Sequence, residues 1–155
     1  MAAGCFVTAA ATAAPLIASM SPSSDIETER TVDVDLSDIP PGGVKVVEWQ
    51  GKPVFVLRRD AKMTELAGAK TTIDPQDDGD RIKRPEWLIV EGVCQHLGCV
   101  PIWRPEGRRA WHCPCHGSEY DFSGRAIKKP TPKNLAVPPY EFLSDGAIRL
   151  GTPQG

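Results

Sequence analysis

The sequence lacks charge where many proteins carry it. The first 24 residues contain no charged side chain, and the rest of this 155-residue chain has no basic patch interleaved with aromatic residues. The formal net charge at pH 7 is −2. Nucleic-acid-binding proteins contact phosphates through clustered Lys and Arg, so the composition predicts no nucleic-acid partner. The length suits one compact domain.

The patterns of several common protein classes are also absent. There is no glycine-rich loop that would cradle a phosphate, no Ser-His-Asp order typical of hydrolases, and no internal repeat. Glycine and proline are plentiful instead, at 14 and 15 residues. Because both residue types interrupt helices and favour turns, the sequence predicts many short strands rather than long helices.

The uncharged N-terminal segment is rich in alanine and about 20 residues long, which is enough to cross a bilayer as a helix. Three interpretations stay open from composition alone: a membrane anchor, a secretory signal peptide and a buried core helix. No basic residue precedes the segment, as one would in a signal peptide. Residues 19–29, SMSPSSDIETE, are polar and read as a linker.

After the linker, alternating apolar and polar residues together with turn residues predict short strands joined by turns. Asp60 is a suitable N-cap for a short helix over residues 60–67, and residues 74–80, DPQDDGD, are predicted to form a solvated loop. Strands are predicted at residues 31–36, 44–49, 54–57, 87–90, 140–142 and 147–150.

Two short segments carry the chemistry. Residues 94–99 read CQHLGC and residues 113–118 read CPCHGS, so each combines a cysteine with a histidine. A [2Fe-2S] cluster can be held by two thiolates on one iron and two imidazoles on the other, which raises its reduction potential. Structural zinc is the alternative, but its usual spacing pairs cysteines first and histidines second. The spacing therefore favours iron.

These segments resemble the cluster-binding motif of the Rieske family, and in particular the respiratory Rieske subunits of ubiquinol–cytochrome c reductase, the cytochrome bc1 complex. The resemblance implies one [2Fe-2S] cluster with the four ligands Cys94, His96, Cys113 and His116. It places the cysteines on the buried iron and the histidines on the outer iron.

The resemblance also implies a disulfide between Cys99 and Cys115. Closing a loop of about 15 residues is worth about 3 kcal/mol. Rieske domains of oxygenases generally lack this pair, so its presence favours the respiratory branch and an oxidising compartment. Two free, buried thiols are the alternative.

Two hydroxyl side chains lie where the family has hydrogen-bond donors to the cluster. By resemblance, Ser118 donates to a bridging sulfide and Tyr120 to the sulfur of Cys94, which raises the potential further. The plain alternatives are a turn serine and a core tyrosine. Residues 128–132, KKPTP, resemble the proline loop that shields the cluster. The chain departs from the usual pattern at three positions that are not ligands: Gln95, Glu119 and Lys129.

The resemblance implies an oxidoreductase subunit, part of a translocase, that oxidises ubiquinol and reduces cytochrome c1. His116 would contact quinol and take up its proton with the electron, while Leu97 would pack against the quinone site of cytochrome b. Cytochrome b and cytochrome c1 are the implied partners, in a dimeric complex. Alternatives are a Rieske subunit of a cytochrome b6f complex or of arsenite oxidase, and a soluble Rieske ferredoxin.

The family architecture sets the expected organisation. It comprises a single-pass transmembrane anchor at residues 1–20, a flexible tether at 21–29 and a Rieske domain at 30–155. Truncation and misassignment of the start of the anchor stay open as alternatives. The domain is expected to be a small antiparallel β-sandwich with a cluster-binding subdomain at about 92–132. The expected location is the inner membrane of a bacterium with the domain on the periplasmic side, or alternatively the mitochondrial inner membrane facing the intermembrane space.

Overall fold

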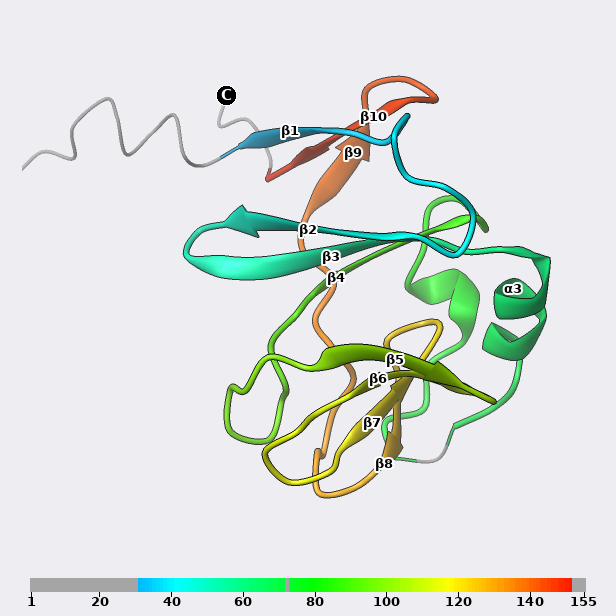
Figure 1. The fold of residues 1–155 in the computed structure, drawn as a ribbon, viewed down its shortest axis with the longest axis vertical. Helices are drawn as coiled ribbons and strands as arrows, with labels where there is room; N and C mark the ends of the chain where they lie inside the picture. The colour runs from blue at the N-terminus through cyan, green and yellow to red at the C-terminus, as the bar shows by residue number, and fades with distance from the viewer. Residues whose placement is uncertain (1–30, 72, 152–155) are drawn as a thin grey trace, which may run out of the picture.

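The computed structural model describes residues 31–71 and 73–151, which form three stacked antiparallel sheets (Figure 1). The mainly β, antiparallel fold predicted from the sequence is confirmed. The anchor expected at 1–20 and the tether expected at 21–29 lie outside the described residues. Within the described part of the chain, no helix combines the length and the apolar character needed to span a membrane.

The outer sheet has the order β1 (Val32–Asp35), β10 (Ala147–Leu150), β9 (Tyr140–Phe142). The middle sheet contains β2 (Val44–Trp49), β3 (Lys52–Arg58) and β4 (Trp87–Glu91). Its first hairpin turns through Gln50 and Gly51, both at positive φ, as a two-residue turn requires. The strands predicted for both sheets are confirmed, with ends that differ by no more than two residues.

Strands β3 and β4 of the middle sheet are buried on both faces, and they carry continuous apolar runs rather than alternating ones. Phe55, Leu57, Leu88 and Val90 contribute to one core, shared with the cluster-binding sheet. The intervening side chains contribute to a second core against the outer sheet, and they include Val54, Val56, Trp87 and Ile89. The middle sheet thus packs against the cluster-binding sheet on one face and against the outer sheet on the other.

The third sheet contains β5 (Ile102–Glu106), β6 (Arg109–His112), β7 (Glu119–Asp121) and β8 (Ala126–Lys128). These strands fall inside the expected cluster-binding subdomain, and the sequence did not predict them individually. They are short, and each pairing contains a register shift, so the alternating pattern that marks a strand is interrupted.

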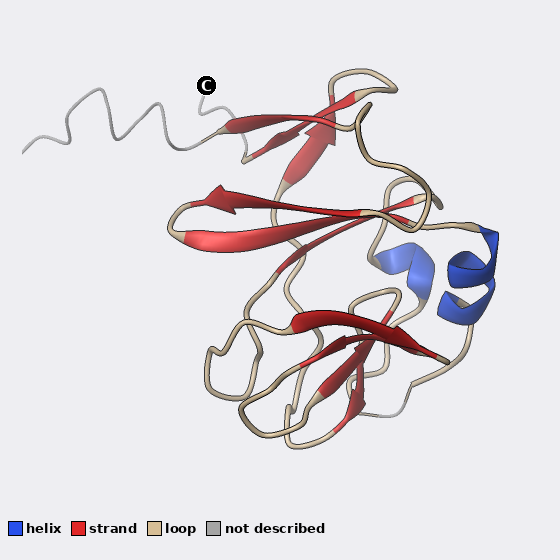
Figure 2. Cartoon of the chain, viewed as in Figure 1, coloured by secondary structure: helices blue, strands red, loops and turns tan. Residues whose placement is uncertain are grey.

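Helix α3 (Ala61–Ala67) begins after Asp60, whose carboxylate accepts a hydrogen bond from the Met63 amide at 2.8 Å. This confirms the predicted helix and its N-cap. Figure 2 shows α3 and the 3₁₀ helix η1 (Asp78–Asp80) together at one edge of the molecule. The segment at 74–80 is more than a solvated loop, because Asp78 pairs with the buried Arg59 guanidinium at 2.7 Å.

A second buried ion pair fixes the turn between β7 and β8. The Arg125 guanidinium and the Asp121 carboxylate lie 2.7 Å apart, and both side chains are almost fully buried. Arg125 also donates to the carbonyl oxygens of Ala67, Ala69 and Gln76. This pair therefore joins the cluster-binding sheet to the end of α3 and the segment that follows it.

Candidate metal centre

Two loops bring the predicted ligands together, and they close in the same way. The first runs from β4 to β5, and the second from β6 to β7. In the first loop the Cys94 amide donates to the Cys99 carbonyl at 2.8 Å, and the Gly98 amide donates back to the Cys94 carbonyl at 2.9 Å. The second loop repeats both bonds from Cys113 to Ser118, at 2.8 and 3.0 Å, with Gly117 in the place of Gly98.

A disulfide between Cys99 and Cys115 joins the two loops, as the resemblance implied. The sulfur atoms of Cys99, Cys115 and Cys113 lie within 4.8 Å of one another. Because two of these sulfurs are bonded to each other, they are not available as thiolate ligands. Cys113 and Cys94 remain as free thiols, and both are buried.

The predicted ligands lie on the two joined loops as a pair of thiols and a pair of imidazoles, together called the group. The Cys94 and Cys113 thiols are close enough for each to shift the pKa of the other, and the ring centroids of His96 and His116 are 4.7 Å apart. The Nδ1 atom of His96 is buried and has no hydrogen-bond partner among the described residues. A buried imidazole nitrogen without a partner is costly unless it binds a metal. The group therefore fits a metal centre with two sulfur and two nitrogen ligands.

The pKa values of the two thiols are shifted in opposite directions. Burial raises the pKa of Cys94, but hydrogen bonds from Tyr120 and from the backbone at His96 outweigh burial and lower the pKa overall. Burial raises the pKa of Cys113 as well, and there the neighbouring Cys94 adds to the rise. Backbone amides of Cys115 and His116 partly offset it. The Cys94 sulfur is thus the better stabilised thiolate.

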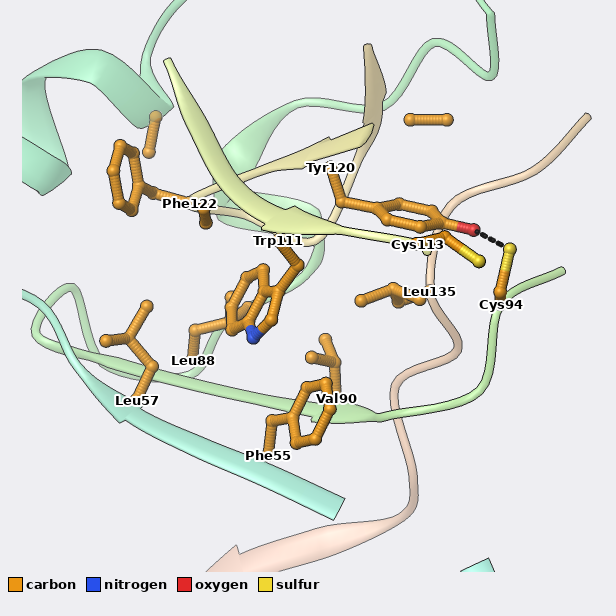
Figure 3. Close-up of a cluster of buried hydrophobic side chains, with 13 residues drawn as sticks. Phe55, Leu57, Leu88, Val90, Cys94, Trp111, Cys113, Tyr120, Phe122 and Leu135 are labelled. Atoms are coloured by element: carbon orange, nitrogen blue, oxygen red, sulfur yellow. Dashed lines mark hydrogen bonds between the residues drawn. The ribbon is translucent and has the colours of Figure 1, made fainter. Parts of the chain in front are cut away.

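The Tyr120 hydroxyl donates to the Cys94 sulfur at 3.1 Å, and Figure 3 shows the sulfur of Cys113 beside this contact. Burial and the neighbouring Cys94 raise the pKa of Tyr120, which keeps the hydroxyl protonated as a donor. The Ser118 hydroxyl, from the second loop, also lowers the pKa of Cys94. Both side chains are fully buried.

One residue of the proline loop contacts both hydroxyls and was given no role by sequence reasoning. The Thr131 amide donates to Ser118 Oγ, and Thr131 Oγ1 lies 3.0 Å from the Tyr120 hydroxyl. Its identity carries no signal in the sequence, because a threonine between two prolines suits many loops. Only its position beside these two residues reveals it.

The surface around the group carries exposed apolar and charged residues. Leu97 is 69 % exposed at the tip of the first loop, and His116 is exposed while His96 is only partly so. On the outer face of the sheet, Glu119 lies 3.2 Å from the Lys128 amine and 3.4 Å from the Arg109 guanidinium. Burial opposes ionisation of Glu119, but these cations outweigh it and lower the pKa of the carboxyl.

Stacked antiparallel sheets with a two-thiol, two-imidazole group at the tip of one sheet define an iron–sulfur protein of the mixed Cys/His type. The Rieske [2Fe-2S] domain family matches residues 29–140, and the chain belongs to this family. Rieske domains bind one [2Fe-2S] cluster, and the four side chains described above have the donor types that it requires.

Curated relatives include the mitochondrial cytochrome b-c1 complex subunit Rieske of Solanum tuberosum, which is 48 % identical over 87 % of this chain and 52 % of its own length. The ubiquinol-cytochrome c reductase iron-sulfur subunit of Rickettsia felis is 47 % identical over 88 % of this chain and 80 % of its own length. The chain thus spans about half the length of the plant relative. A solved structure described as hyperthermophilic respiratory complex III aligns with a TM-score of 0.59 and 28 % identity, over 92 % of this chain and 99 % of that chain.

Proposed function

We propose that this chain is the electron-transfer subunit of a ubiquinol–cytochrome c reductase. It takes one electron and a proton from ubiquinol and passes the electron to cytochrome c1. The similarity to curated subunits of that complex carries the proposal. The disulfide across the two loops supports it, because Rieske domains of oxygenases generally lack this pair.

The proposed ligands are Cys94 and Cys113 for one iron and His96 and His116 for the other. When bound, the cluster supplies a one-electron acceptor of high potential. Cys94 and Cys113 lie in the buried part of the group, where hydrogen bonds stabilise the Cys94 thiolate. The orphaned Nδ1 of His96 supports ligation through that atom.

We assign the quinol contact to His116, because it is the more exposed of the two imidazoles. In this proposal Nδ1 of His116 binds the metal, and Nε2 accepts the hydrogen bond and then the proton of the quinol hydroxyl. Leu97 offers an apolar surface beside it for cytochrome b. Its 69 % exposure means that packing within its own loop does not account for an apolar side chain at this position.

The remaining parts of the proposal come from the relatives and the sequence. Cytochrome b and cytochrome c1 are the proposed partners in a dimeric complex. Residues 1–20 are proposed as the single-pass anchor and 21–29 as the tether. The proposed location is a bacterial inner membrane with the domain on the periplasmic side, or the equivalent side of the mitochondrial inner membrane.

Electron paramagnetic resonance on the full chain, before and after ascorbate, tests the proposal. A Rieske-type signal that appears with this mild reductant is the expected result, because only a high-potential cluster is reduced by it. A signal that requires dithionite would reject the quinol-oxidising function in favour of a low-potential ferredoxin. Zinc in elemental analysis, with no signal under either reductant, would reject the cluster itself.

Replacing Leu97 with alanine tests the docking role of the loop tip. We expect slower quinol oxidation in the assembled complex, with an unchanged spectrum and potential. Val46→Ala is the matched control, since Val46 is 60 % exposed on β2, outside the cluster-binding sheet. Equal rates in both variants would remove Leu97 from the quinol site.

A further inference from the structure

Thr131 is a fully buried residue with three hydrogen-bond contacts, two of which are to Ser118 and Tyr120 at the metal centre. Its amide donates to Ser118 Oγ at 3.0 Å. Its hydroxyl donates to the Lys133 carbonyl at 3.0 Å and lies 3.0 Å from the Tyr120 hydroxyl. Because Thr131 is buried and both its amide and its hydroxyl have hydrogen-bond partners, it is an ordered part of the site.

The contact between Thr131 and Tyr120 depends on which of the two hydroxyls donates its proton. The Thr131 hydroxyl has one proton, which the Lys133 carbonyl accepts, so toward Tyr120 it presents only lone pairs. The Tyr120 hydroxyl also has one proton, and two acceptors face it: Cys94 Sγ at 3.1 Å and Thr131 Oγ1 at 3.0 Å. The two acceptors therefore share, or compete for, a single donor.

We propose that Thr131 is a positioning residue that lowers the reduction potential of the bound cluster by offering Tyr120 an alternative acceptor. This inference rests on the cluster site proposed above, but not on the identity of the electron donor. Hydrogen bonds strengthen as the acceptor gains negative charge. Reduction therefore draws the Tyr120 proton toward Cys94, and oxidation lets it return toward Thr131.

The direction of the effect follows from which state each acceptor favours. A bond from Tyr120 to Cys94 stabilises the reduced state more than the oxidised state. A bond from Tyr120 to Thr131 is available mainly in the oxidised state, so it stabilises that state. Removing the Thr131 hydroxyl removes this second bond and leaves Cys94 as the only acceptor. The potential should then rise.

Redox titration of the Thr131→Val variant, followed by circular dichroism, tests the proposal. Valine keeps the shape of threonine and the backbone amide that anchors Ser118, and removes only the hydroxyl. We expect a higher midpoint potential than in the unmodified protein, and the unmodified potential in Thr131→Ser. Thr64→Val, which removes a hydroxyl bonded to the Asp60 carbonyl near the start of α3, is the control and should leave the potential unchanged.

The Tyr120→Phe background makes the test specific. If Thr131 acts through the Tyr120 proton, Thr131→Val has no effect on the potential once that hydroxyl is gone. An unchanged or lower potential in the single variant would overturn the proposal, and so would an equal rise in the Tyr120→Phe background. If the Thr131→Val variant does not bind the cluster, Thr131→Ala replaces it in the same redox titration. Ascorbate reduction of the unmodified protein tests the cluster site separately.

Discussion

The two loops of the metal centre share one backbone frame but place different side chains on it. Both close with the same pair of hydrogen bonds, and both have glycine at positive φ at the fifth position. The histidine stands at the third position in the first loop and at the fourth position in the second. The bridging cysteine stands at the sixth position in the first loop and at the third position in the second.

This shift of one position makes the two imidazoles inequivalent. His96 is partly buried, and its Nδ1 atom is enclosed, whereas His116 is exposed. A repeated frame thus yields one histidine that is partly buried and one that is exposed. The thiols differ as well, because Tyr120 and Ser118 both lower the pKa of Cys94 in the first loop, whereas the pKa of Cys113 is raised.

The largest expected effect comes from the buried ion pair at the turn between β7 and β8, which follows the second loop. Asp121→Ala leaves the Arg125 guanidinium buried without its carboxylate, which should cost about 3–5 kcal/mol of unfolding free energy. Chemical denaturation measures this loss. Asp33→Ala, which breaks an exposed pair with Arg149, is the control and should leave the unfolding free energy within experimental error. Equal losses would mean that burial of the pair is unimportant.

The next largest effect comes from the link between the loops. Cys115→Ser opens the disulfide and should cost about 3 kcal/mol, and it should speed loss of the cluster. Denaturation and the decay of visible absorbance measure the two effects. A thiol reductant should reproduce them in the unmodified protein and add nothing in the variant. A variant as stable as the parent would show that the loops are held together without the disulfide.

Because the two loops share one backbone frame, alanine at Gly98 and alanine at Gly117 should lower the unfolding free energy by equal amounts, as measured by chemical denaturation. At Gly98 and Gly117 a Cβ would meet nothing within 4 Å, so the cost is the left-handed backbone alone, at φ of +82° and +77°. Each alanine substitution should cost about 1–2 kcal/mol. Gly79→Ala is the control, because that position is equally open but has no positive φ. Clearly unequal costs at Gly98 and Gly117 would contradict the equivalence of the loops.

The smallest effect on folding comes from the two hydroxyls. Ser118→Ala and Tyr120→Phe should each lower the unfolding free energy by about 1 kcal/mol. Their main consequence is a lower midpoint potential with the cluster retained, because Tyr120 donates a hydrogen bond to the Cys94 sulfur and Ser118 also lowers the pKa of Cys94. Redox titration of the two variants measures this. Unchanged potentials in both would show that neither hydroxyl tunes the cluster.

Much of the outer and middle sheets could be predicted from the sequence, because apolar alternation and turn residues act over a few neighbours. The strands at 44–49 and 140–142 and the Asp60 cap have the predicted bounds. Strands β5–β8 could not be predicted, because bulges interrupt their pattern and the loops between them carry ligands. The Asp78–Arg59 pair was missed, because it joins residues 19 positions apart through the fold.

The sequence by itself determined the donor set, since residue type decides which atoms can bind iron, and the spacing of Cys94, His96, Cys113 and His116 is local. It also determined most strands of the outer and middle sheets, because the apolar alternation that marks a strand is local as well. Only the tertiary structure decided which histidine is exposed, that the Tyr120 hydroxyl donates to Cys94, and that Thr131 lies against Tyr120. These depend on where separate loops meet, because a hydrogen bond requires contact within about 3 Å, which residue order alone does not specify.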